Sequence, residues 1–187
     1  KFVGESRSPK ARHLDLGGGL GIRYRDETPP DIGAYLHEVF ARVGGRRLKL
    51  LFEPGRCLVG NAGVRITRIE YLNPGAPRNL AVVEHAMNEL IRPAWYEAWH
   101  DFVAVRPNGE RMLANIAGPV CESGDTFAMG RESDAVKSDD LAVFRTPGAY
   151  GATVASPYTR RARAPEALVG GHRHDVAADA LTPAPTP

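Results

Sequence analysis

Two short segments of the chain carry groups that suit a phosphorylated ligand. Residues 17–21 read Gly-Gly-Gly-Leu-Gly after an apolar stretch, and glycine lets backbone N–H groups converge on an anion with no side chain in the way. Residues 53–56 read Glu-Pro-Gly-Arg after a second apolar run. They offer a carboxylate for a cationic ring nitrogen and a guanidinium for a carboxylate.

Each of these segments has a simpler explanation when it is taken alone. Residues 17–21 are as well explained by a glycine turn without a ligand, and residues 53–56 by a tight turn with a surface ion pair. The glycines lack the GxGxxG spacing and no helix follows them directly, which disfavours a Rossmann dinucleotide site.

Three further side chains have types that could do chemistry. Cys121 precedes Glu122, and a thiol beside an acid could be catalytic, although a lone cysteine is more commonly buried and inert. Arg92 and Tyr96 are four residues apart, so one helix face could present a guanidinium and a phenol together; surface decoration is the more common explanation. The two histidines at 172 and 174 are too few for a metal site, and no metal is predicted.

The first 62 residues predict the elements that position the two loops. Residues 13–16 form a short strand signal, and residues 48–52 an apolar run typical of a buried strand. Between them Asp31 is a candidate N-cap, Gly44-Gly45 ends the helix, and six apolar residues share one helical face: Ile32, Tyr35, Leu36, Val39, Phe40 and Val43. A strand, helix and strand in this order predict a parallel pair, with both loops at the carboxyl ends of the strands.

Beyond residue 62 the pattern changes to short strands separated by Pro and Gly turns, which is typical of an antiparallel sheet. Strands are expected at 64–72, 80–83, 102–105, 112–116, 141–144 and 150–155, with a helix at 93–100. The expected domains are therefore 1–62, an α/β portion, and 63–174, an all-β domain. A Pro-rich, disordered tail is expected at 175–187.

Composition excludes several classes of protein. The chain has 187 residues, 43% hydrophobic and 25% charged, with a net charge of +2, which is ordinary for a globular protein. Its scattered basic residues leave no nucleic-acid footprint, and no apolar run approaches the length of a membrane span. Two cysteines and no signal-peptide pattern favour free thiols in the cytoplasm.

Taken together, the motifs resemble those of the diaminopimelate decarboxylases over residues 13–170. The segments that carry the resemblance are Leu-Asp-Leu-Gly-Gly-Gly-Leu-Gly-Ile at 14–22, Glu-Pro-Gly-Arg at 53–56, Val-Gly-Asn-Ala-Gly at 59–63, Met-Asn-Glu-Leu-Ile-Arg-Pro at 87–93 with Tyr96, Gly-Pro-Val-Cys-Glu-Ser-Gly-Asp at 118–125 and Gly-Ala-Tyr-Gly at 148–151. The pair of Glu-Pro-Gly-Arg and Cys-Glu-Ser-Gly-Asp in this order is specific.

The resemblance implies a pyridoxal 5'-phosphate enzyme of the alanine-racemase-like fold type. Residues 1–62 would be the last two βα units of a (β/α)8 barrel, whose final loops form a common phosphate site, and an antiparallel β domain would follow. The enzyme would be a cytoplasmic homodimer with shared active sites that converts meso-diaminopimelate to L-lysine and CO2 in lysine biosynthesis.

The resemblance also assigns roles to individual residues. The cofactor would be held by Gly19, Glu53, Pro54, Gly55, Arg56 and Tyr150, with Glu53 on the pyridine nitrogen. The substrate would be bound by Arg56, Arg92, Tyr96, Glu122 and Tyr150. Cys121 would act as a catalytic residue, and both Cys121 and Glu122 would enter the neighbouring subunit's site.

Several departures from the family pattern keep alternatives open. The Schiff-base lysine belongs to a barrel strand upstream, and none of Lys1, Lys10, Lys49 or Lys137 lies in a matching motif. His85 replaces a small residue and could crowd the site, and Pro157 removes a backbone donor.

The chain therefore reads as a fragment that is inactive and poorly soluble alone, because two βα units cannot close a barrel. A related decarboxylase with another amino-acid substrate, or a catalytically dead regulatory relative, are the alternatives.

Overall fold

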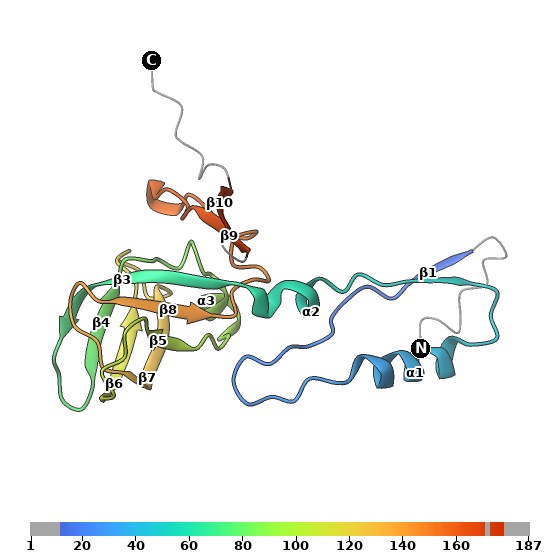
Figure 1. The fold of residues 1–187 in the computed structure, drawn as a ribbon, viewed down its shortest axis with the longest axis horizontal. Coiled ribbons are helices and arrows are strands. Elements are labelled where there is room, and N and C mark those ends of the chain that lie inside the picture. Colours follow the sequence, from blue (N-terminus) through green and yellow to red (C-terminus); the bar gives the residue numbers. More distant parts are fainter. Residues whose placement is uncertain (1–11, 171–172, 178–187) are drawn as a thin grey trace, which may run out of the picture.

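The computed structural model describes residues 12–170 and 173–177. The chain forms an extended N-terminal arm (residues 12–62), a six-stranded sheet, and a hairpin beside that sheet (Figure 1). Within the arm, β1 (His13–Asp15) pairs in parallel with β2 (Lys49–Leu51), and α1 (Ile32–Val43) connects them. The predicted strand, helix and strand, and their parallel pairing, are confirmed.

The ends of α1 follow from the residues that flank it. Asp31 caps the helix, since its carboxylate accepts a hydrogen bond from the backbone N–H of Ala34 at 2.8 Å. At the other end, the N–H of Gly44 donates to the carbonyl of Phe40 at 2.7 Å. Both predicted ends of the helix are confirmed.

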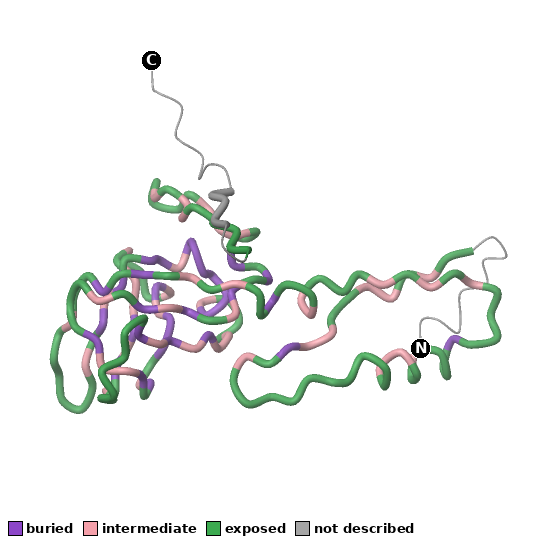
Figure 2. Tube along the Cα trace, in the orientation of Figure 1, coloured by how far each residue is buried: buried purple, intermediate pink, exposed green. Residues whose placement is uncertain are grey.

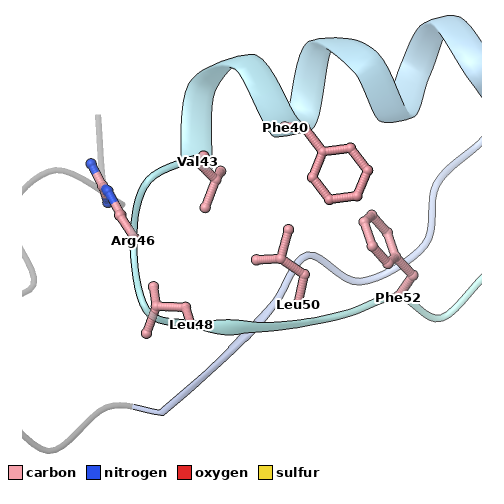
Figure 3. Close-up of a pocket in the computed structure, with 7 residues that line it drawn as sticks. Phe40, Val43, Arg46, Leu48, Leu50 and Phe52 are labelled. Atoms are coloured by element: carbon pink, nitrogen blue, oxygen red, sulfur yellow. The ribbon is translucent and has the colours of Figure 1, made fainter.

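Among residues 12–170 and 173–177, no layer of the structure covers the apolar face of the arm. Figure 2 shows the arm largely exposed and the buried residues concentrated in the sheet. Phe40 of α1 is 53% exposed and Leu51 of β2 is 39% exposed. The prediction that residues 48–52 form a buried strand is therefore wrong for this chain. Phe40, Val43, Leu48, Leu50 and Phe52 instead line an open apolar pocket (Figure 3).

The second part is a mixed sheet with the strand order β5-β8-β3-β4-β6-β7. Its strands are β3 (Val64–Asn73), β4 (Asn79–Val83), β5 (Phe102–Ala104), β6 (Arg111–Ala117), β7 (Thr126–Asp134) and β8 (Leu141–Arg145). Four neighbouring pairs are antiparallel, but β4 and β6 pair in parallel. The expectation of a purely antiparallel domain is thus corrected to a mixed one.

The two edge strands of this sheet approach each other. The backbone N–H of Ala104 in β5 donates to the Asp134 carboxylate of β7 at 3.0 Å, which nearly closes the sheet. Inside lies the core: Ile69, Val83, Leu90, Phe102, Ala104, Ile116, Phe127, Ala128, Val136, Ala142 and Phe144. The hydrophobic core therefore lies inside the nearly closed sheet.

Four local features of the structure differ from the expectations: two elements were not predicted, one predicted strand is absent, and one helix is shorter. Strand β7 was not predicted, because Gly130 and three charged residues interrupt its apolar pattern. The strand expected at 150–155 is a series of turns, in which Tyr150 has a left-handed φ of 68°. The helix expected at 93–100 is the shorter α3 (Arg92–Tyr96), which ends where Glu97 turns left-handed at φ 50°.

The hairpin of β9 (Glu166–Gly170) and β10 (Arg173–Ala177) was also not predicted. Strand β10 includes residues 175–177, which the sequence had placed in the tail, and residues 178–187 lie outside the described residues. The remaining elements are α2 (Gly55–Val59) and the 3₁₀ turns η2 (Gly60–Ala62) and η3 (Tyr158–Arg160). Across the described ranges, no helix is both long enough and apolar enough to cross a membrane.

Candidate functional site

The glycine-rich loop and the Glu-Pro-Gly-Arg loop lie in direct contact at the carboxyl ends of β1 and β2. The backbone N–H of Glu53 donates to the carbonyl of Gly17 at 2.8 Å. Gly18 is required at its position, because a Cβ there would collide with the carbonyl oxygen of Glu53. The expectation that the two loops meet at one edge of the parallel pair is confirmed.

Both loops border open space. Positions for a Cβ on Gly19, whose φ is +90°, and on Gly55 have no atom within 4 Å. Arg56 follows at the start of α2, and its Nε is buried without a hydrogen-bond partner. A buried guanidinium N–H without a partner is costly, so this edge of the sheet suits an additional acceptor such as a phosphate or carboxylate.

Tyr150 reaches the same edge from a distant part of the chain. Its ring centroid lies 5.6 Å from Cζ of Arg56. The turn that carries Tyr150 packs against α2 and η2, since the N–H of Gly148 donates to the carbonyl of Gly60 at 3.2 Å, and a Cβ on Gly148 would collide with the carbonyl of Val59. The structure therefore brings Gly19, Glu53, Pro54, Gly55, Arg56 and Tyr150 together in one region.

Arg92 lies in a separate, buried cluster. Its Nη1 is 3.1 Å from Nε2 of His100, and its Cζ is 4.7 Å from the ring centroid of Tyr24. Because arginine can only donate, Nε2 of His100 is the acceptor, and Nδ1–H of His100 donates to the carbonyl of Arg145 at 3.0 Å. Burial lowers the pKa of His100 to about 4, and the nearby cations Arg92 and Arg131 add to the shift.

The neighbouring Trp99 is contacted by two cations. Cζ of Arg25 lies 4.4 Å and Cζ of Arg131 lies 3.6 Å from its ring centroid. Arg131 also donates a hydrogen bond to the carbonyl of His100, and burial lowers the pKa of Arg131 to about 10. No local sequence pattern marks Trp99, His100 or Arg131, so the sequence predicts no role for them.

Tyr96 lies away from Arg92, although both belong to α3. The Tyr96 side chain is 68% exposed and packs edge-on against Trp95, with ring centroids 6.2 Å apart. Arg92 is 8% exposed. The helix therefore presents the phenol to solvent and holds the guanidinium inside.

Cys121 and Glu122 are exposed on a loop that a buried carboxylate shapes. Asp125 accepts the N–H of Val120 at 2.7 Å and the N–H of Met87 at 2.6 Å. Burial raises the pKa of Asp125, while these two hydrogen bonds oppose the shift. Asp125 thereby joins the Cys121–Glu122 loop to the segment that follows β4.

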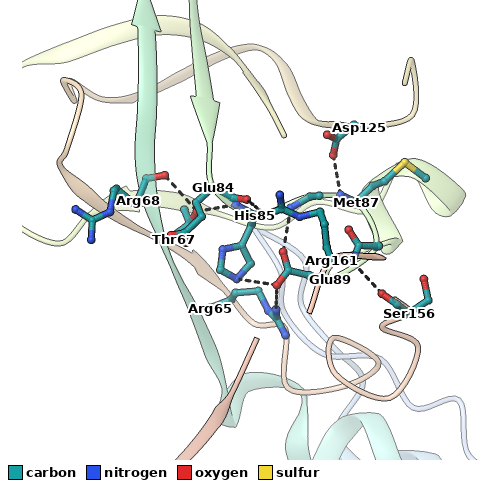
Figure 4. A network of polar contacts seen from close by, with 12 residues as sticks. Arg65, Thr67, Arg68, Glu84, His85, Met87, Glu89, Asp125, Ser156 and Arg161 are labelled. Carbon is teal, nitrogen blue, oxygen red and sulfur yellow. Dashed lines mark hydrogen bonds and ion pairs between the residues drawn. The ribbon is translucent and has the colours of Figure 1, made fainter. Parts of the chain in front are cut away.

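That segment, residues 84–90, contains a buried polar cluster (Figure 4). Oε1 of Glu89 lies 3.7 Å from Nη1 of Arg65 and 3.9 Å from Nε2 of His85. Burial and the cations Arg65 and Arg161 lower the pKa of His85 to about 4. His85 is therefore neutral near pH 7, and its approach to Glu89 is a dipolar contact rather than an ion pair. The histidine is accommodated in the core at 7% exposure.

Neither of the two lysines in the described part of the chain lies in a motif that suggests cofactor attachment. Lys49 lies exposed in β2 and Lys137 lies exposed in a turn, while Lys1 and Lys10 fall outside the described residues. In the described part of the chain, no group of three or more His, Cys, Asp or Glu side chains is placed to hold a metal ion.

Comparison with known proteins identifies the family. The model of the pyridoxal-dependent decarboxylases, C-terminal sheet domain, matches residues 13–148. The chain belongs to the pyridoxal-dependent decarboxylases. It is 51% identical over 163 residues to the diaminopimelate decarboxylase of Neisseria meningitidis serogroup A, covering 87% of this chain and 40% of the relative. The Pseudomonas aeruginosa diaminopimelate decarboxylase is 51% identical over 167 residues, covering 88% and 40%.

Solved structures of this decarboxylase family agree with that assignment. Diaminopimelate decarboxylase from Helicobacter pylori, complexed with L-lysine, superposes with a TM-score of 0.81 at 30% identity, over 88% of this chain and 41% of that chain. A lysine/ornithine decarboxylase from Vibrio vulnificus, with a TM-score of 0.72 and 20% identity over 82% and 42%, shares the fold alone. The chain spans about 40% of the length of the curated relatives it matches.

Proposed function

We propose that this chain is the C-terminal portion of a diaminopimelate decarboxylase, which removes one carboxylate of meso-diaminopimelate to give L-lysine and CO2. The observation that carries the proposal is the contact between the glycine loop and Glu53, with Arg56 and Tyr150 beside them, in a chain about half identical to named diaminopimelate decarboxylases. The arm would supply the last two βα units of a barrel, and the enzyme would work in lysine biosynthesis as a cytoplasmic homodimer.

The residues at the edge of β1 and β2 fit pyridoxal 5'-phosphate. Bound there, the cofactor would supply an electron sink for the loss of the carboxylate. Backbone around Gly19 and residues 53–56 would hold its phosphate region, where open space and the unpartnered Nε of Arg56 suit an anion. Glu53 would keep the ring nitrogen protonated, and Tyr150 would reach the phosphate from the opposite turn.

Substrate recognition would involve Arg56, Arg92, Tyr96, Glu122 and Tyr150. A carboxylate on the distal end of the substrate would pair with arginine, and a substrate without it would leave the buried charge of Arg92 without an anion. Arg92 is held by a neutral His100, so its charge is not neutralised by that contact. Exposed Glu122 would enter the neighbouring subunit's site and face the distal ammonium, with Cys121 as the catalytic thiol beside it.

A chimaera tests this function, since the chain matches only part of its relatives. Residues 12–170 would replace the corresponding part of the Neisseria meningitidis enzyme, and CO2 release from meso-diaminopimelate, L-ornithine and L-lysine would be measured. We expect release from meso-diaminopimelate. Release from ornithine alone would assign a different substrate, and a soluble chimaera that binds the cofactor but releases no CO2 would contradict a catalytic role.

A further inference from the structure

The bend of residues 23–27 lies between the glycine loop and α1, where the chain runs back from β1 to the sheet (Figure 1). Its own hydrogen bonds hold it in shape. One carboxylate oxygen of Glu27 accepts the backbone N–H groups of Tyr24 and Arg25, at 2.9 and 2.8 Å. Nε of Arg23 donates to the carbonyl of Glu27 at 3.0 Å. The side chain of Tyr24 is therefore carried by a fixed backbone.

The segments that follow the glycine loop and the Glu-Pro-Gly-Arg loop meet at this bend. Ile22 comes directly after the glycine loop and is buried, and a Cβ on Gly60 would collide with its side chain. Asn61 comes after the Glu-Pro-Gly-Arg loop and α2, and its Nδ2 donates to the carbonyl of Arg23 at 3.0 Å. The position of Tyr24 is thus tied to both loops that are proposed to hold the cofactor.

The ring of Tyr24 contacts Arg92 and His100. Cζ of Arg92 lies over this ring, 4.7 Å from its centroid, and the ring of His100 meets it edge-on with centroids 5.7 Å apart. The Tyr24 hydroxyl is buried and has no hydrogen-bond partner among the described residues. The aromatic ring, rather than the hydroxyl, therefore holds the guanidinium, since a cation is attracted to the face of a ring and most strongly where water is excluded.

Arg92 has uncharged neighbours at both of these side-chain contacts. Tyr24 offers its ring and His100 offers the lone pair of Nε2. Across residues 12–170 and 173–177, no carboxylate forms an ion pair with Arg92 within 4 Å. A buried cation without an anion is costly, so Arg92 is held in place with its charge available to an anionic ligand.

We propose that Tyr24 is a positioning residue that fixes Arg92 relative to the two cofactor loops, and thereby selects a substrate whose distal carboxylate lies at the matching distance. This rests on the proposed function. Tyr24 acts through Arg92, because a guanidinium on a flexible stem loses its rotamer freedom on the ring before the substrate arrives. A substrate of the right length then meets an arginine that is already in place.

The binding test compares two ligands with the same carbon chain between their amino groups. L-lysine carries a carboxylate at its distal end, and cadaverine has none. Calorimetry on the chimaera loaded with pyridoxal phosphate gives both dissociation constants. In Tyr24→Leu we expect L-lysine to bind about five- to thirtyfold more weakly, the range of a desolvated cation–π contact, and the constant for cadaverine to change by less than about twofold.

Three further variants serve as controls. Tyr24→Phe keeps the ring and should keep the preference for L-lysine. Tyr71→Leu changes an exposed tyrosine of β3 and should leave both dissociation constants unchanged. In an Arg92→Gln background, Tyr24→Leu should have no further effect on L-lysine, because Tyr24 acts through Arg92.

Equal weakening of both ligands in Tyr24→Leu would make Tyr24 a merely structural residue and overturn the proposal, as would unchanged binding of L-lysine. A chimaera that releases no CO2, but loses its preference for L-lysine in Tyr24→Leu, would contradict the proposed function and support the positioning role. An active chimaera whose preference does not depend on Tyr24 would do the reverse. A soluble chimaera that binds neither ligand would overturn both.

Discussion

Acidification should destabilise the chain through His100, a side chain that is 2% exposed. The ordinary pKa of histidine is 6.5, and burial lowers that of His100 to about 4. The unfolded chain therefore takes up a proton at this residue as the pH falls below 6.5, while the folded chain resists it until about pH 4. The stabilisation by neutral His100 is thus fully present above pH 6.5 and is lost as the pH falls toward 4.

The size of this effect follows from the pKa difference. Between pH 7 and pH 5 the linkage relation gives a loss of about 2 kcal/mol from His100. With a typical dependence of the unfolding free energy on urea, the midpoint should fall by about 1 M. Trp99 lies in this cluster, with Cζ of Arg131 3.6 Å from its ring centroid, so tryptophan fluorescence at submicromolar protein concentration reports the unfolding of the cluster.

His85 shifts in the same direction, so the contribution of His100 is isolated by comparing variants. In His100→Gln, the loss of stability between pH 7 and pH 5 should be smaller than in the unsubstituted chain by about 2 kcal/mol. His37→Gln, which changes an exposed histidine of α1, should retain the full loss. Equal pH dependence in His100→Gln and the unsubstituted chain would refute the assignment of His100 as a buried neutral acceptor for Arg92.

Three further predictions concern the loops and the arm. Asp125→Asn replaces one of two oxygens that accept backbone N–H groups and should cost about 2–4 kcal/mol, seen as a lower Tm; an unchanged Tm would contradict the role of this carboxylate. Gly18→Ala should force the loop away from Glu53 and weaken pyridoxal phosphate binding by the chimaera in a spectroscopic titration, whereas Gly170→Ala, which meets no atom within 4 Å, should not. The chain alone should self-associate in sedimentation experiments through the exposed face around Phe40, and a monodisperse, cooperatively melting monomer would contradict this.

Local signals in the sequence predicted much of the arm correctly. Asp31, the apolar periodicity and Gly44 define α1, because capping and amphipathicity depend on residues a few positions apart. The contact of the two loops was also predictable, since carboxyl ends of parallel strands share one edge. The failures also have physical causes. Gly130 interrupts the apolar alternation of β7, so this strand was missed. The left-handed backbone at Glu97 ends α3 early, and that at Tyr150 lies in a turn where a strand was expected.

What the amino-acid sequence determined by itself was the family, through its motifs, and the elements whose signals are local. Only the tertiary structure decided that β4 and β6 pair in parallel, that Arg92 is buried on Tyr24, and that Asn88 anchors the loop of Tyr158. These features join residues far apart in the chain. Their energies depend on burial and on which hydrogen-bond partners remain once water is excluded, and neither is defined until the sheet has closed around its core.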